Sequence, residues 1–363
     1  MSQETRAGQG DRADRPTLAS VAARAGVALS TASLVFSGSP RVAAATRERV
    51  LAAAAELDYA GPDPLARSLR SRRSGTVGVV VGERLLYAFR DPVAVALLDG
   101  IAEVLSPLGV GLLLLPGDDR RDGPSVPQLS RAALDAAVYL TGGLEDDPAL
   151  EHLRRRGVPV VAVEGPVAQD LVLISIEDHS GSIELAGHLR ALGHFRVAVV
   201  ALPLRLDRTF GLIDPARRDR AAYRDVRERL RGIEDVFGPV PAIETAANTV
   251  EEGERAAGVL LDVTPRARPT AILAQSDLLA AGVLRAAAAL GLRVPEDLSV
   301  TGFDGIDLPW LAPTRLTTVV QPLEEKGRAA GRAAAALLAG QRPADLVLPV
   351  HLRIGTTTGP AAA

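Results

Sequence analysis

Apolar residues recur at helical spacing in three short stretches near the start of the chain. The first stretch follows Thr17, a residue type that favours the N-cap of a helix, and it ends at Gly26. The second runs from about Thr31 to Phe36 and the third from about Ala44 to Leu57. Three short helices, with a glycine-containing turn between the first two, predict a helix-turn-helix unit over residues 16–60.

Polar segments border this predicted unit on both sides. Residues 1–15 are polar and aperiodic, which predicts a disordered tail. Residues 61–75 form a linker in which Asp63 and Pro64 are typical of a helix start, so we expect about two turns of helix from Pro64 to Arg70. A helix this short is marginal alone in water and needs a partner, either a second copy of itself or DNA.

From Thr76 onward, short apolar runs alternate with amphipathic stretches of helical spacing. The run TVGVVV predicts a buried strand, and similar runs recur as far as LSVTGF, which ends at Phe303. Helices are expected at 92–105, 149–156, 180–192, 217–230, 250–261 and 280–290. This alternation predicts parallel sheets with right-handed crossovers, in two lobes with a cleft between them. Ligands of such sheets bind near the carboxyl ends of the strands.

The composition is that of a globular protein, and it excludes several kinds of site. The 363 residues suit two or three domains, and 47% of them are hydrophobic while 23% are charged. No apolar run approaches the roughly 18–20 residues of a membrane span, and the start lacks the pattern of a secretory signal. We therefore expect a cytoplasmic protein with no membrane partner. The absence of cysteine excludes disulfides, a cysteine nucleophile, thiolate zinc sites and iron–sulfur clusters.

Charge is divided unevenly along the chain. Residues 1–75 hold eleven arginines and seven acidic residues, so this part carries +4 while the remaining 288 residues carry −7. A basic head on an acidic body indicates a polyanionic partner at one end of the protein. Lys326 is the only lysine, which leaves almost no place for a Walker-type phosphate loop or a Schiff-base lysine.

Several motifs follow one another in a distinctive order. The head contains TLASVAARAGV from Thr17 and TRERVLAAAAELDY from Thr46, the linker contains ARSLR, and the body contains GFDGIDLPWLAPTRLTTVVQP from Gly302. Over residues 16–359 the chain resembles the LacI-type transcription regulators, the family of the lactose and galactose repressors. The resemblance implies an all-α helix-turn-helix DNA-binding head and a two-lobed, periplasmic-binding-protein-like α/β body with parallel sheets.

The resemblance also implies how the body is divided. Residues 76–363 would form an effector-binding and dimerisation domain that follows the hinge. The first lobe is expected to span about 76–175 plus 323–345. The second lobe is expected to span about 176–322 plus 346–363. The effector would bind in the cleft between these two lobes.

The resemblance implies that the second helix of the head lies in the major groove of DNA. The residues expected at the bases are Leu29, Ser30, Thr31, Ser33 and Leu34, and those expected at phosphates are Thr17, Arg41, Thr46 and Arg47. For any one arginine, a solvated surface role is the alternative. The family commonly has arginine where this chain has Leu34, so a bidentate contact to guanine is lost there.

Two linker residues are expected to contact the minor groove. The resemblance implies that Leu69 inserts between base steps and bends the duplex, with the small Ala66 beside it to allow close approach. The alternative is that Leu69 is a packing residue between two hinge helices. Both interpretations require the linker to form a short helix.

The effector residues expected from the resemblance are Asp178, Arg220, Asn248, Ser276, Asp304 and Gln321. Asp304 follows a strand, where a carboxylate can hold ligand hydroxyls or a cation. Asp277 immediately precedes a helix and is open to a simpler role as its cap. The family's effector-binding arginine is Asp219 here, and its neighbours Arg218 and Arg220 are the candidates to replace it. Aromatic residues make up only 3% of the chain, so a sugar effector rests on analogy rather than on stacking platforms.

Two classes of function remain, and the motifs favour the first. One is a ligand-responsive transcription regulator, most often a repressor in this family, that binds a pseudo-palindromic operator as a dimer. The other is a small-molecule-binding protein or enzyme with a vestigial head. The chain lacks G-x-G-x-x-G after its first strand, G-x-x-x-x-G-K-[ST], G-x-S-x-G and H-E-x-x-H.

We therefore expect a nucleoid-associated regulator with no enzymatic activity, cofactor or metal. Its expected partners are double-stranded operator DNA, a small-molecule effector such as a sugar, and a second copy of the chain in a homodimer. A tetramer built from such dimers is left open. The operator sequence and the direction of the effector's action are not encoded in any motif of the chain.

Overall fold

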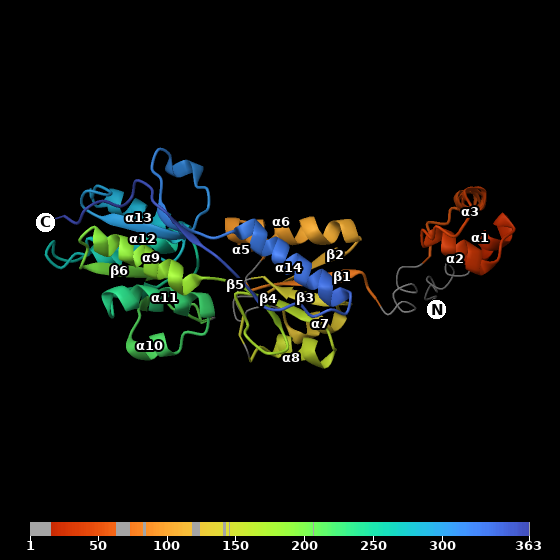
Figure 1. Cartoon of the computed structure of the whole chain (residues 1–363), viewed down its shortest axis with the longest axis horizontal. Helices are drawn as coiled ribbons and strands as arrows, with labels where there is room; N and C mark the ends of the chain where they lie inside the picture. The colour runs from red at the N-terminus through yellow and green to blue at the C-terminus, as the bar shows by residue number, and fades with distance from the viewer. Residues whose placement is uncertain are drawn as a thin grey trace, which may run out of the picture. The chain divides into compact units, whose positions relative to one another are not determined.

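The computed structural model describes residues 16–62, 73–82, 85–117, 124–140, 143–144, 146–205 and 207–362 (Figure 1). The chain divides into two compact units, Met1–Ser74 and Gly75–Ala363, which are the head and the body. The predicted tail over residues 1–15 lies outside the described residues, as does the predicted hinge helix with Ala66 and Leu69.

The head is built from three short helices around a small apolar core. They are α1 (Leu18–Ala25), α2 (Leu29–Phe36) and α3 (Ala44–Glu56). Val21, Ala32 and Val50 are fully buried where the three helices meet. α1 and α2 are bent by 108° relative to one another, which is the geometry of a helix-turn-helix unit.

Local sequence sets both ends of α1, as its pattern predicts. The backbone N–H of Ser20 donates to Thr17 Oγ1 at 3.2 Å, and the backbone N–H of Thr17 donates to Ser20 Oγ at 2.8 Å. This reciprocal capping box satisfies two donors at the start of the helix. Gly26 ends the helix with a φ of 64°, a left-handed conformation that glycine adopts without steric cost. The caps thereby fix the turn that leads into α2.

No single helix in the described parts of the chain is long and apolar enough to cross a bilayer. α1 and α2 together have the length and composition for it as a bent pair. Their apolar side chains, however, pack against α3 in the core of the head.

The first lobe of the body is a parallel sheet with helices on both faces. In sheet order its strands are β12 (Leu346–Leu348), β5 (Val172–Ile176), β4 (Val160–Val163), β3 (Ala136–Tyr139), β1 (Thr76–Val81) and β2 (Gly111–Pro116). Its helices are α5 (Leu85–Ala88), α6 (Pro92–Leu105), α7 (Val126–Arg131), α8 (Pro148–Arg155) and α14 (Leu323–Leu338), with a 3-10 turn at Ser106–Leu108. Side chains alternate along β1, so Val79 packs under α6 and α14 while Val80 packs under α7 and α8 (Figure 1).

The second lobe repeats this arrangement. In sheet order its strands are β13 (His351–Arg353), β11 (Thr317–Val320), β10 (Ser299–Asp304), β9 (Ala271–Ala274), β6 (Val197–Ala201), β8 (Ala242–Glu244) and β7 (Gly211–Leu212). Its helices are α9 (Asp178–Ala191), α10 (Pro215–Asp219), α11 (Arg224–Phe237), α12 (Val250–Leu261) and α13 (Asp277–Ala289), with a 3-10 turn at Pro309–Leu311. α9 and α11 cover the face that carries Val199, and α12 and α13 cover the face that carries Val200.

The chain passes between the two sheets after β5, after β11 and after β12. One boundary differs from the prediction, which assigned residues 346–363 entirely to the second lobe. Leu346–Leu348 pairs in parallel with Ile174–Ile176 and so belongs to the first sheet. The return to the second sheet comes only at β13, which pairs antiparallel with β11. Three short segments therefore join the lobes beside the cleft.

The prediction of a single helix over residues 217–230 is wrong, because this stretch contains parts of two helices. Asp214 accepts a hydrogen bond from the backbone N–H of Arg217 and begins α10. The helical ladder stops because the backbone N–H of Ala222 donates instead to the carbonyl of Leu204, in the loop that follows β6. α11 then begins at Arg224. A tertiary hydrogen bond thus overrides a locally continuous helical pattern.

Candidate functional site

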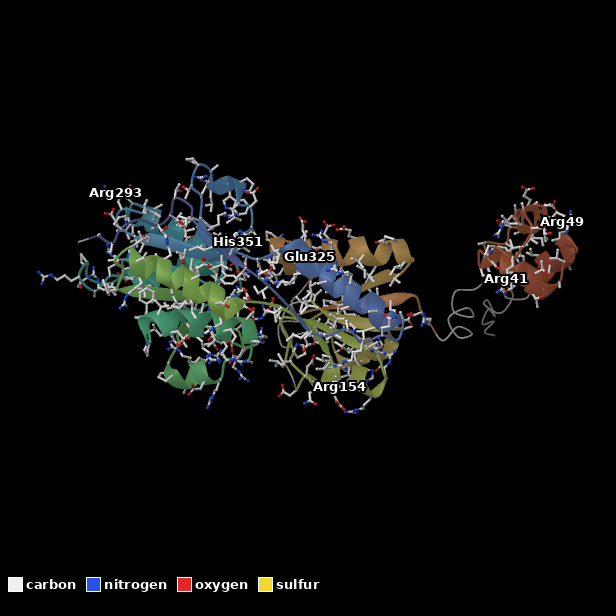
Figure 2. The ribbon with its side chains drawn as sticks, viewed as in Figure 1. Arg41, Arg49, Arg154, Arg293, Glu325 and His351 are labelled. Carbon is white, nitrogen blue, oxygen red and sulfur yellow. The ribbon has the colours of Figure 1, made fainter. Side chains whose placement is uncertain are left out.

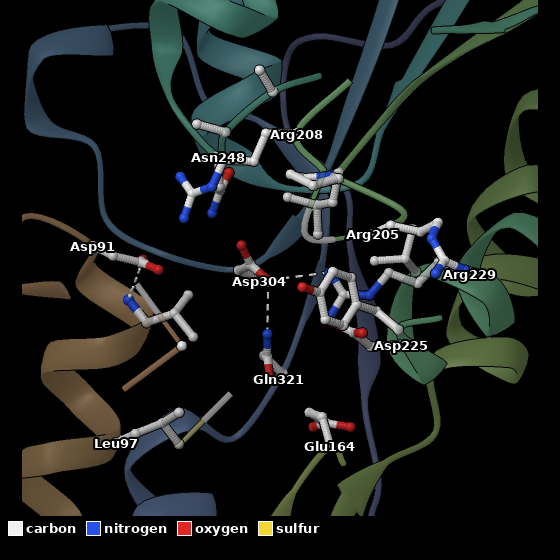
Figure 3. Close-up of a pocket in the computed structure, with 18 of the residues that line it drawn as sticks. Asp91, Leu97, Glu164, Arg205, Arg208, Asp225, Arg229, Asn248, Asp304 and Gln321 are labelled. Carbon is white, nitrogen blue, oxygen red and sulfur yellow. Dashed lines mark hydrogen bonds and ion pairs between the residues drawn. The ribbon is translucent and has the colours of Figure 1, made fainter. Parts of the chain in front are cut away.

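A cavity of about 160 Å³ lies between the two lobes at the carboxyl ends of their strands (Figure 3). From the first lobe it is lined by Gly82, Asp91, Val93, Leu97, Glu164 and Lys326. From the second lobe and the connecting segments it is lined by Leu202, Pro203, Arg205, Arg208, Tyr223, Asp225, Val226, Arg229, Ala246, Ala247, Asn248, Asp304 and Gln321. This is the position in which parallel α/β sheets bind ligands.

Three of the six predicted effector residues line this cavity: Asn248, Asp304 and Gln321. Ser276 lies behind the wall, where its hydroxyl donates to Asn248 Oδ1 at 2.5 Å and accepts from the backbone N–H of Leu279. Ser276 therefore orients Asn248 and caps α13 rather than lining the cavity.

The other two predicted effector residues also lie outside the cavity lining. Asp178 is buried, and its Oδ1 accepts from Arg229 Nε at 2.8 Å, so it supports a cation that does line the cavity. Arg220 is exposed at the end of α10, and the structure does not bring it to the cavity. The arginines of the cavity are instead Arg205, Arg208 and Arg229.

Asp304 forms the centre of the polar floor of the cavity. Its Oδ1 accepts a hydrogen bond from Gln321 Nε2 at 2.7 Å and lies 3.6 Å from Arg229 Nη1. Burial raises the pKa of Asp304 to about 6, although the nearby Arg229 charge opposes the shift. Its φ of 118° is a backbone conformation that residues with side chains rarely adopt, and such conformations cluster at functional sites.

Arg229 lies between the carboxylates of Asp178 and Asp304 at the wall of the cavity. The sequence pattern did not lead to a prediction of this role. Besides its bond to Asp178, it donates from Nη1 to the carbonyl of Gln275 at 2.7 Å. Its guanidinium also lies over the ring of Phe303, 3.7 Å from the centroid. A signal for this role was present, because Arg229 falls on the apolar stripe of α11, next to the buried Leu230.

The only lysine of the chain connects the two lobes through the same floor. Lys326 is buried on α14, and its Nζ donates to Glu164 Oε1 at 2.9 Å and to Gln321 Oε1. Gln321 in turn donates to Asp304, so a continuous set of contacts runs from Glu164 in the first lobe to Asp304 in the second. Glu164 Oε2 is buried and has no hydrogen-bond partner among the residues that the structure describes.

Asp277 does not cap α13, contrary to one expectation, because Ser276 occupies the N-cap position. Asp277 Oδ2 accepts from the backbone N–H of Ile306 at 2.9 Å, and its Oδ1 accepts from Thr318 Oγ1 at 2.6 Å. Burial raises the pKa of Asp277 to about 8. The residue thus braces the loop that follows Asp304. In the described parts of the chain, no group of three or more histidine, aspartate and glutamate side chains is placed to hold a metal ion.

The outer face of α2 carries the residues predicted to read DNA bases. Leu29 and Leu34 are 53% and 41% exposed on this face. Ser30 is exposed as well, whereas Thr31 and Ser33 are half-buried. The inner face of the same helix buries Ala32 and Val35.

The residues predicted to contact phosphates differ in their exposure and in the hydrogen bonds that they already make within the head. Arg41 is exposed, as Figure 2 shows together with Arg49, and Thr46 is half-buried at the start of α3. Arg47 donates to the carbonyls of Val35 at 3.3 Å and Ser39 at 2.6 Å, so it braces the segment between α2 and α3. Thr17 caps α1. Phosphate contacts by these residues stay predictions.

Comparisons with known proteins identify the family. Residues 17–61 match the family model described as bacterial regulatory proteins, lacI family, and residues 186–358 match a periplasmic binding protein-like domain. An HTH-type transcriptional regulator of Mycobacterium tuberculosis is 36% identical over 359 residues, which cover 96% of this chain and 98% of that protein. The chain belongs to the LacI family.

Other members of the LacI family match along nearly their whole length. The regulator CelR of Thermobifida fusca is 32% identical over 95% of this chain and 98% of that protein. A solved CelR–cellobiose complex has a TM-score of 0.66 and 30% identity, covering 94% of this chain and all of that one. The lac repressor dimer bound to operator and the anti-inducer ONPF has a TM-score of 0.74 and 26% identity, covering 95% of this chain and 99% of that one.

These findings confirm the predicted fold class and the family. The chain is a DNA-binding transcriptional regulator with a helix-turn-helix head and a periplasmic-binding-protein-like α/β body. Its curated relatives are named as regulators and not as enzymes.

Proposed function

We propose that this LacI-family regulator is a repressor that binds a pseudo-palindromic operator as a homodimer and responds to a small molecule in the cavity. The observation that carries the proposal is that one chain joins a helix-turn-helix head to a cavity with polar groups from two lobes. The similarity to the operator-bound lac repressor dimer and to the CelR–cellobiose complex supports it.

DNA recognition in this proposal depends on α2. Leu29, Ser30 and Leu34 form its exposed face, with Thr31 and Ser33 at the edges, and this face enters the major groove. One head reads only a few base pairs, so a homodimer with two heads is the smallest assembly that can read a palindrome. The minor-groove contacts of Leu69 and Ala66 belong to the same proposal.

Effector binding in this proposal depends on the floor of the cavity. A sugar or a related metabolite bonds through its hydroxyls to Asp304, Asn248 and Gln321. Because the cavity is lined from both lobes, its ligand interacts differently with each relative position of the lobes. A ligand shifts DNA affinity only through such a difference.

DNA binding by the full chain and by a chain that lacks residues 1–75 tests the proposal. The full chain should select a pseudo-palindromic site from random DNA and lose affinity steeply with salt, because arginines displace counterions from phosphates. The truncated chain should keep its secondary structure and lose this binding. Sequence-specific binding by the truncated chain would rule out the head as the DNA reader.

A further inference from the structure

The loop between β6 and β7 contributes two arginines to the lining of the cavity. Arg205 and Arg208 both line it, and Figure 3 shows Arg208 reaching over the cavity next to Asn248. Arg208 has a φ of 48°, in the left-handed region that residues with side chains rarely adopt. A backbone conformation of this kind persists only where the surroundings hold it.

A cluster of ion pairs around the buried Glu244 holds this loop in place. Arg217 donates to Glu244 Oε2 at 2.7 Å and to Asp207 Oδ2 at 2.6 Å. Glu244 is 1% exposed, and its Oε1 accepts from the backbone N–H of Leu204 at 2.8 Å. The loop is therefore tied on both sides of Arg205 and immediately before Arg208. Two flexible side chains are thus presented from a fixed backbone, which reduces the entropy lost on binding a ligand.

The other cations of the cavity are already neutralised. Arg229 is bonded to Asp178 and lies beside Asp304, and Lys326 is bonded to Glu164. The backbone N–H of Arg208 donates to the carbonyl of Arg205, but its guanidinium makes no hydrogen bond or ion pair within the described part of the chain.

The remaining charged residues that line the cavity are Arg205, Asp91 and Asp225. Arg205 donates from Nη1 to the backbone carbonyl of Arg220 at 2.8 Å, which leaves its charge without a bonded carboxylate. Asp91 accepts from the backbone N–H of Val93, and Asp225 interacts with the charge of Arg229. The charge of Arg205 also acts on the nearby Asp207, so Arg208 is the arginine of the cavity whose guanidinium has no partner among the described residues.

The floor of the cavity offers the opposite kind of group. Glu164 is buried, and within the described residues its Oε2 has no hydrogen-bond partner, although an unsatisfied buried carboxylate oxygen is costly. A ligand hydroxyl is a suitable donor for this atom. The cavity thus presents a hydrogen-bond acceptor on its floor and the guanidinium of Arg208 as a donor.

We propose that the effector is an anionic polyol, a sugar or related polyol that carries a carboxylate or a phosphate. Its acidic group binds Arg208, whose planar guanidinium group matches the geometry of both anions. Its hydroxyls bind Glu164 and Asp304. This inference rests on the proposed function in that the cavity is the effector site, and it specifies the chemical class of the ligand.

Calorimetry with matched hexoses tests the inference on the full chain. The probes are glucose, glucuronate, glucose 6-phosphate and inorganic phosphate. The wild-type chain should bind at least one anionic hexose about tenfold or more tightly than glucose, since a hydrogen bond to a charged group contributes about one to two factors of ten. Comparison of glucuronate with glucose 6-phosphate and phosphate distinguishes a carboxylate ligand from a phosphate ligand.

The variant Arg208→Gln should reduce the ratio of the affinity for the anionic hexose to the affinity for glucose. Arg266→Gln is the matched control, because Arg266 is exposed and does not line the cavity. The inference is overturned if glucose binds as tightly as the anions, if the preference survives in Arg208→Gln, or if no anionic probe binds. Operator binding by the same samples tests the repressor proposal separately.

Discussion

At the scale of single residues, Asp304 gives the site a measurable dependence on pH. Burial raises its pKa to about 6, above the value of about 4 of an exposed aspartate. A carboxylate with a raised folded-state pKa stabilises the fold while protonated, and this contribution is lost as pH rises through the folded-state value. The loss therefore falls between about pH 4 and pH 6, and it amounts to roughly 3 kcal/mol at most.

The variant Asp304→Asn tests this pH dependence of stability. Its side chain keeps an oxygen that can accept a hydrogen bond from Gln321, but it does not ionise. Its free energy of unfolding should rise relative to that of the wild-type chain as pH increases from 4 to 7. Denaturant unfolding of both proteins at several pH values measures the difference. A difference that stays constant over this range would show that Asp304 is not the titrating group.

Arg229 carries the second prediction at this scale. Replacing it with methionine leaves Asp178 and Asp304 buried without their cation, and breaking such a pair costs about 3–5 kcal/mol. Arg231→Met is the control, since that side chain is 63% exposed two residues along the same helix. The control should change stability by about 0.5 kcal/mol or less. Equal losses in denaturant unfolding of the two variants would contradict the role of Arg229.

The sequence predicts some residues of the cavity floor and does not predict others. Asp304 and Gln321 follow strands and match family motifs, so both are predicted and both line the cavity. The contact between Lys326 and Glu164 joins residues 162 positions apart, and no local pattern encodes such a pairing. Arg205 and Arg208 lie in a loop whose position depends on tertiary contacts.

At the scale of elements, the proposed reading of DNA bases by α2 leads to a prediction about sequence preference. Leu34 is exposed on its outer face, so Leu34→Arg places a guanidinium where a base edge is expected. A bidentate contact to guanine contributes about 1–3 kcal/mol of discrimination. The selected binding sites of the variant should therefore gain a guanine that the wild-type sites lack.

Leu51→Arg is the matched control for this prediction, because Leu51 is 47% exposed on α3 rather than on α2. It adds the same charge and should strengthen binding to all sequences alike at low salt. In-vitro selection with the three proteins compares the preferences. If the Leu34→Arg profile equals the wild-type profile, position 34 does not face bases.

Elements with strong local signals are predicted closely, and those shaped by tertiary contacts are not. α1 begins after Thr17 and ends at Gly26 as predicted, because both caps are local. The single helix predicted over 217–230 is instead divided by a bond between Ala222 and Leu204, which lie far apart in the predicted pattern. The same limit applies to β12, whose partner strand is known only from the fold.

At the scale of the whole molecule, the body is suited to couple a ligand to the relative position of its lobes. The contacts from Glu164 through Lys326 and Gln321 to Asp304 cross from one lobe to the other at the cavity floor. Under the proposed function, a ligand that bonds to both ends of this set changes the balance between arrangements of the lobes. A coupling of 1–3 kcal/mol, typical of allosteric proteins, changes DNA affinity about 5- to 150-fold.

The most direct test of this account is an anisotropy titration of the selected operator with the full chain, with and without the hexose that calorimetry finds to bind. The ligand should change the operator Kd by about 5- to 150-fold in the wild-type chain. In Asp304→Ala the ligand should leave the Kd unchanged, while the Kd without ligand stays close to the wild-type value. A ligand-induced change of the same size in both proteins would contradict the account, as would the absence of any sequence-specific binding.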